Sequence, residues 1–95
     1  MPEPRQDAEL RQDEIAVLFA TWEASHGSLN AHVPEHAMRN KIVRSHRRLF
    51  KEALKSILRR PEAYIIRHPT GGEMTYQITR NGRDKLFELG LISYS

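Results

Sequence analysis

The chain contains no cysteine, and this absence excludes disulfide bonds and metal sites built on thiolates. It is compatible with a reducing compartment, and we expect a cytoplasmic protein. No apolar run approaches the roughly 20 residues that a membrane-spanning helix needs, and residues 1–7 lack the apolar core of a leader peptide. The sequence therefore predicts no membrane segment.

Motifs of catalysis are also missing. There is no glycine-flanked serine, no glycine-rich phosphate loop and no close pair of carboxylates in an apolar setting. We therefore expect no enzyme and no cofactor. His32 and His36 have the spacing of two ligands on one helical face, but Pro34 lies between them and no third ligand is evident. The prediction is that the chain holds no metal.

The composition is that of a folded domain with a basic charge. Its 95 residues are 39% hydrophobic, which suits one compact core. We expect residues 1–6 to form a flexible N-terminus and residues 7–95 to form the domain. The net charge of +3 and the isoelectric point near 9.6 favour an anionic partner if the charge gathers on one surface.

Apolar residues at helical spacing predict two helices in the first half of the chain. The first covers residues 7–24, with Asp7 as its cap and Gly27 just beyond its end. The second begins near Pro34, which suits a first helical turn, and runs to about residue 43. Its inward residues are Val33, Ala37 and Met38.

A third helix is predicted over residues 44–60, with Ser45 as a possible cap and Pro61 as its end. Its apolar stripe follows a repeating i, i+3, i+4 pattern and consists of Leu49, Phe50, Ala53, Leu54, Ile57 and Leu58. No glycine separates this helix from the preceding one. A single long helix in place of the two is therefore the alternative.

The remainder of the chain predicts a β-hairpin and a last helix. Residues 63–67 and 73–78 are the strands, joined by a turn with two glycines. Alternation places Met74, Tyr76 and Ile78 toward the core and Glu73, Thr75 and Gln77 toward water. The last helix begins at Thr79 or Asn81, carries Leu86, Phe87 and Leu89, and closes at Gly90.

The segment Tyr76-Gln77-Ile78-Thr79-Arg80-Asn81-Gly82-Arg83-Asp84-Lys85-Leu86 resembles a strand and following helix start found in many winged helix-turn-helix regulators. With the order of elements, the resemblance to this superfamily of prokaryotic DNA-binding transcription regulators covers residues 7–91. It implies an α+β fold with a three-helix core, a β-hairpin wing and a C-terminal helix. It further implies that the third helix enters the major groove of DNA. The chain departs from the usual pattern between the second and third helices and at Pro61.

Positive charges are concentrated along the predicted third helix. On a helical wheel they fall within a sector of about 120°, and they are Arg44, Arg47, Arg48, Lys51, Lys55 and Arg59. A merely solvated face tends to mix signs, whereas here like charges stand at i, i+4 spacing, which destabilises a helix slightly. Duplex phosphates would neutralise such a face, and Arg47 or Arg48 could read guanine.

The predicted hairpin and the flanking apolar segments suggest further contacts. Arg67, His68 and Thr70 surround the glycine turn and could bind phosphate, although an ordinary tight turn explains the glycines equally well. With Ser45 they complete the predicted DNA-binding set. We expect a homodimer formed through the first helix and the C-terminal tail. The alternatives for function are a protein-docking module and, less favoured, an RNA-binding domain.

Overall fold

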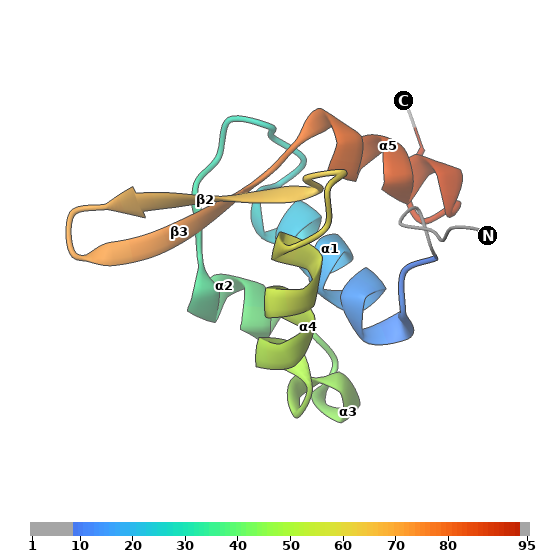
Figure 1. Ribbon diagram of the computed structural model, residues 1–95, viewed down its shortest axis with the longest axis horizontal. Helices are drawn as coiled ribbons and strands as arrows, with labels where there is room; N and C mark the ends of the chain where they lie inside the picture. The colour runs from blue at the N-terminus through green and yellow to red at the C-terminus, as the bar shows by residue number, and fades with distance from the viewer. Residues whose placement is uncertain (1–8, 94–95) are drawn as a thin grey trace.

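The computed structural model describes residues 9–93 (Figure 1), so the flexible N-terminus and the Asp7 cap predicted above lie outside the described residues. The elements are α1 (Gln12–Ala24), β1 (Val33–Pro34), α2 (Glu35–Asn40), α3 (Arg44–Arg47), α4 (Phe50–Leu58), β2 (Ile65–Thr70), β3 (Glu73–Ile78) and α5 (Arg80–Glu88). They form an α+β domain with one three-stranded antiparallel sheet. Within the described residues no helix is both long and apolar enough to span a bilayer.

Helix α1 begins at Gln12, where Arg11 is the N-cap residue. The Arg11 backbone N–H donates to Glu14 Oε1 at 2.9 Å, and so the fourth residue of the capping box satisfies a backbone donor of the first turn. The helix ends as predicted, because His26 and Gly27 adopt φ angles of 55° and 76° and turn the chain away.

The central helices differ from their predictions. Helix α2 ends at Asn40, with Lys41 as its C-cap, and α3 begins only at Arg44. The single long helix is therefore wrong. The prediction of one helix over residues 44–60 is also wrong. A turn at residues 48–49 interrupts it and separates α3 from α4. Residues 43–49 contain no carboxylate that could support a helix through i, i+4 pairs, and Arg44 and Arg48 would repel at that spacing.

The predicted hairpin and its second strand are confirmed, but the first strand runs over Ile65–Thr70 and not over residues 63–67, so the turn is shorter than predicted. Strands β2 and β3 pair from Ile65–Ile78 to Thr70–Glu73. On the other side of β3 lies β1, which the sequence did not predict: Val33, expected to face inward from a helix, is buried on a strand and pairs with Tyr76. The sheet order is β1-β3-β2.

Two residues of β3 contradict the predicted alternation. Met74 was assigned to the core but is 40% exposed, since it is the second residue of β3 and lies next to the turn of the hairpin. Thr75 was assigned to water but is buried, and its Oγ1 donates to the His68 backbone oxygen at 2.5 Å. Tyr76 and Ile78 are buried as predicted.

Helix α5 is held tightly against the rest of the domain. Thr79, one of the two starts predicted for this helix, is its N-cap and accepts a hydrogen bond from the Gly82 N–H at 3.1 Å. Gly82 is buried so closely that an added Cβ would meet the Tyr64 backbone oxygen and, at 2.8 Å, a carbon of Ile78. Gly90, with φ of 77°, follows the end of the helix.

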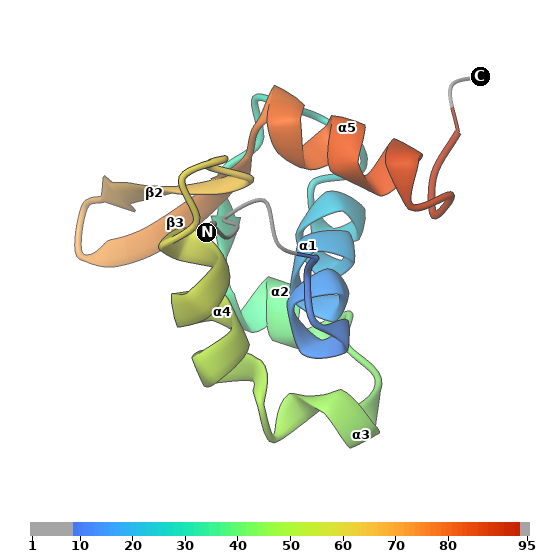
Figure 2. The same cartoon turned by 45° about the vertical axis from the view of Figure 1, so that its right-hand side comes forward.

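The hairpin projects from the body of the domain, and α3 lies at the end of the molecule away from α5 (Figures 1 and 2). Helix α4 packs against α1 on one side and β2 on the other. Its buried residues are Phe50, Ala53, Leu54 and Ile57. The arrangement leaves the remaining face of α4 and the adjoining hairpin surface open.

Candidate nucleic-acid interface

The predicted basic ridge is divided by the break between α3 and α4. Arg44 and Arg47 lie on α3, Arg48 lies in the turn, and Lys51 and Lys55 lie on α4. The prediction of one continuous helical face is therefore wrong. All five side chains, and Arg59 at the α4 C-cap, nevertheless remain exposed. Ser45 is also exposed, but it is the second residue of α3 and not its cap.

One cluster of charge belongs to α3 and its following turn. Arg44, Arg47 and Arg48 are exposed there and have no carboxylate partner within the described part of the chain. The Arg47 Nε donates to the Ile42 backbone oxygen at 3.1 Å, which holds this guanidinium against the end of the α2–α3 connection. Val43 and Leu49 flank the arginines and are 63% and 46% exposed.

A second cluster brings residues of α4 and β2 together. Lys51, Lys55 and Arg67 line a groove of about 320 Å³ between α4 and the hairpin. These three were predicted separately, from a helix and from a hairpin. The fold thus places cations that lie far apart in the sequence on the walls of one groove.

The groove also contains residues that the sequence did not single out. Its apolar lining consists of Leu54, Leu58, Met74 and Tyr76. Glu35, the first residue of α2, lines it as well, and its Oε2 lies 3.4 Å from Lys51 Nζ. Burial raises the pKa of Tyr76, and the Glu35 carboxylate raises it further, so this tyrosine stays neutral. Lys51, one of the three cations of the groove, is already paired with the Glu35 carboxylate in the free protein.

The hairpin residues of the predicted site do not gather at the tip. Arg67 belongs to the groove, whereas the His68 ring stacks on that of His32, with centroids 4.4 Å apart and planes 13° apart. Only Thr70 lies at the turn, where Gly71 has a φ of 60°. Added Cβ atoms at Gly71 and Gly72 would meet no atom within 4 Å, so the tip backbone is open to a ligand.

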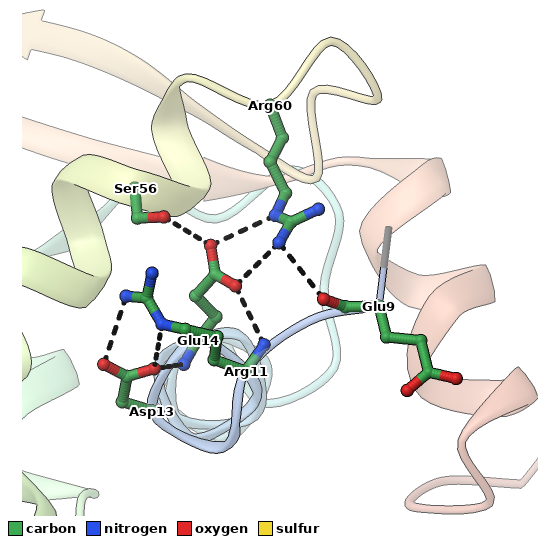
Figure 3. Close-up of polar contacts among 6 residues, drawn as sticks. All are labelled: Glu9, Arg11, Asp13, Glu14, Ser56 and Arg60. Carbon is green, nitrogen blue, oxygen red and sulfur yellow. Dashed lines mark hydrogen bonds and ion pairs between the residues drawn. The ribbon is translucent and has the colours of Figure 1, made fainter. Parts of the chain in front are cut away.

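A buried ion pair fixes the position of α4 (Figure 3). The Glu14 carboxylate, on α1, is fully buried; it accepts from Ser56 Oγ of α4 at 2.6 Å and from Arg60 Nη2 at 2.8 Å. Burial alone would raise the pKa of Glu14, but the hydrogen bonds from Arg60, Ser56 and the Arg11 backbone lower it to about 2. The Glu14 carboxylate therefore stays charged at neutral pH and accepts the hydrogen bonds from both Ser56 and Arg60.

The described residues hold no cluster of three or more histidines or acids that could bind a metal. His32 and His36 do not share a helical face, since His32 precedes β1 and only His36 lies on α2. Comparison of the chain with protein-family models, with curated proteins and with solved structures found no match. Any assignment of function therefore depends on the residues and geometry just described.

Proposed function

We propose that this chain is a winged helix-turn-helix domain that binds double-stranded DNA without catalysing a reaction, as a regulator of transcription or an architectural protein. The observation that carries the proposal is the groove in which Lys51, Lys55 and Arg67 converge. The exposed arginines of α3 and of the turn after it add positive charge just before α4 in the chain. Cations from a helix and a neighbouring hairpin suit phosphates on either side of a DNA groove. Such a protein would act in the cytoplasm of a prokaryote.

The order of elements supports the winged-helix assignment. Helix α1 is followed by a short strand, the helices α2 to α4 and a hairpin, and the first strand pairs with the second strand of the hairpin. In this assignment α4 is the recognition helix and the hairpin is the wing. The clamp between Glu14, Ser56 and Arg60 then serves to hold the recognition helix at a fixed angle.

The contacts divide into two kinds. Arg47 and Arg48, with Ser45, precede α4 in the chain, and we expect them to contact base edges when the start of α4 enters the major groove. Lys51, Lys55 and Arg67 contact phosphates, and Thr70 with the glycine backbone follows the DNA backbone or minor groove. The stack on His32 directs His68 away from this role, and so we expect it to support the wing without binding DNA.

The main rival is a docking module for an acidic protein. Val43 and Leu49 favour it, because apolar side chains that are 63% and 46% exposed beside arginines suit a protein interface. In that case the cations of α3 would surround an apolar contact.

We also propose that two copies associate through α1 and the C-terminal tail. Phe19 and Trp22 of α1, with Leu91 and Ile92 of the tail, line a hollow of about 490 Å³. Leu91 is 42% exposed beside it. Partly exposed apolar side chains that line a hollow on one face allow a two-fold contact in which the same surface of both copies is buried. Sedimentation equilibrium of the wild type and Leu91→Gln tests this proposal: the variant should shift the mass toward the monomer, and a monomeric wild type would refute it.

One experiment separates the candidate functions. The chain is titrated at low salt with a random-sequence duplex, a structured RNA and a polyglutamate peptide, and fluorescence anisotropy is measured. The proposal predicts tightest binding to the duplex. Tighter binding to polyglutamate with indifference to duplex DNA would support the docking module instead.

A further inference from the structure

Met74 is an interior residue by its place on the sheet and a surface residue by its exposure. It shares a face of β3 with the buried Tyr76 and Ile78, yet it is 40% exposed. It lines the groove beside α4 and also a hollow beside α2, and neither helix removes it fully from water. The fold therefore leaves an apolar surface at the place where the sheet extends beyond its helices.

The charges on the walls of the groove are not balanced. Glu35 is paired with Lys51. Lys55 and Arg67 have no carboxylate partner in the part of the chain that the structure describes. A phosphate of DNA would satisfy these two cations but would not cover the apolar lining, since it carries no apolar body.

We propose that this groove binds a small amphipathic anion, a carboxylate on an apolar body, and that the ligand excludes DNA phosphate from the same cations. The carboxylate pairs with Arg67 and Lys55, since a guanidinium can hold both oxygens of a carboxylate. The apolar body lies on Met74 and Leu58 and removes them from water. The volume of about 320 Å³ is at the lower end for ligand pockets, so the ligand is small.

The groove arises only through folding, because its walls come from α2, α4, β2 and β3. For this reason no local pattern in the sequence reveals it. Binding of the anion is independent of the function proposed above, whereas its competition with DNA rests on that function. The two claims can be tested separately.

Octanoate is a suitable probe of the groove. Acetate, which has the carboxylate but no long alkyl chain, and octanol, which has the alkyl chain but no charge, are the control compounds. Binding is followed in the full chain by the methyl NMR signals of the groove residues Met74, Leu54 and Leu58 and of Leu91 and Ile92 in the hollow beside Trp22. We expect saturable shifts with octanoate and at least about tenfold weaker binding of acetate and octanol, because each lacks one of the two interactions. Equal binding of octanoate and octanol, or shifts confined to the hollow beside Trp22, would overturn the proposal.

Matched variants test the two halves of the site. Arg67→Gln and Met74→Gln should each weaken octanoate binding by about threefold to tenfold. Arg80→Gln, an exposed cation on α5, and Ile66→Gln, a 38% exposed residue on the other face of the sheet, should leave it unchanged. Unfolding curves of all four variants show that the domain is intact. Equal loss in the control pair would refute the assignment.

Competition is measured by anisotropy of a labelled duplex in the presence of each probe. Octanoate should raise the apparent Kd of the duplex, and sodium acetate at the same ionic strength should not. If octanoate binds and the chain ignores DNA, the anion site stands and the proposed function fails. If both bind without competing, the shared use of Lys55 and Arg67 is wrong.

Discussion

Arg60 and Glu14 lie 46 positions apart in the sequence, and their side chains form an ion pair of 2.8 Å in the interior. Helix α1 and the end of α4 are joined at this point, and Ser56 adds a second link from α4 to the same carboxylate. The pair connects the fold to the proposed function, because α4 carries Lys51 and Lys55 on its outer side.

Replacing Glu14 with Gln should lower the free energy of unfolding by about 3 kcal/mol at pH 7, since it leaves the Arg60 charge without its buried partner. Urea unfolding followed by circular dichroism measures this. Glu52→Gln, an exposed residue of the same length on α4, is the control and should change stability by less than about 0.5 kcal/mol. Similar losses in the two variants would contradict the clamp.

Acid should weaken the wild type through the same residue. The pKa of Glu14 is lowered to about 2 in the folded chain, against 4.5 as its ordinary value. The stabilisation is therefore complete above about pH 4.5 and is lost as the pH falls toward 2, since the unfolded chain takes up the proton first. Stability measured across this range should fall less steeply in Glu14→Gln. The same slope in both proteins would show that Glu14 is not responsible.

Gly82→Ala should destabilise the domain by about 1 to 3 kcal/mol, because the new methyl group meets the Tyr64 backbone oxygen and the Ile78 side chain. Thermal unfolding measures the loss. Gly72→Ala, at the open hairpin turn, is the control: its added Cβ has no neighbour within 4 Å, and we expect a much smaller change. A tolerated Gly82→Ala would mean that α5 can move away from the sheet.

The outlines of the fold were predictable from local patterns, and the parts that failed depend on distant partners. The α1 end at Gly27, the hairpin and the Thr79 cap follow from turn and capping chemistry within a few residues. Strand β1 is only two residues long and exists because Val33 meets Tyr76, which no local pattern reveals.

Only the positively charged residues of the candidate site were predicted from the sequence. Lys51, Lys55 and Arg67 were identified because runs of cations are visible in the sequence. Their convergence, and the roles of Glu35 and Met74, require the packing of α2, α4 and the hairpin. Glu14 had a local signal, since it stands three positions after Arg11 as in a capping box, but its ion pair with Arg60 could not be read from that.

Removing the carboxylate of Glu35 should strengthen DNA binding. Glu35→Gln frees Lys51 and takes a negative charge from the groove, and so the duplex Kd at low salt should fall by about twofold to fivefold. Anisotropy titration measures the change, with Glu88→Gln as control, because Glu88 is exposed on α5 and also pairs with a lysine, Lys85. Weaker binding in Glu35→Gln would mean that the carboxylate itself contacts the nucleic acid.

The salt dependence of duplex binding tests the central claim most directly. For the wild type, the logarithm of the association constant should fall with the logarithm of salt concentration by about 0.9 for each phosphate neutralised. The Lys55→Gln, Arg67→Gln double variant should bind more weakly and show a slope shallower by about 2, whereas Arg80→Gln should match the wild type. A wild type that ignores duplex DNA at low salt, or a double variant with an unchanged slope, would contradict the account.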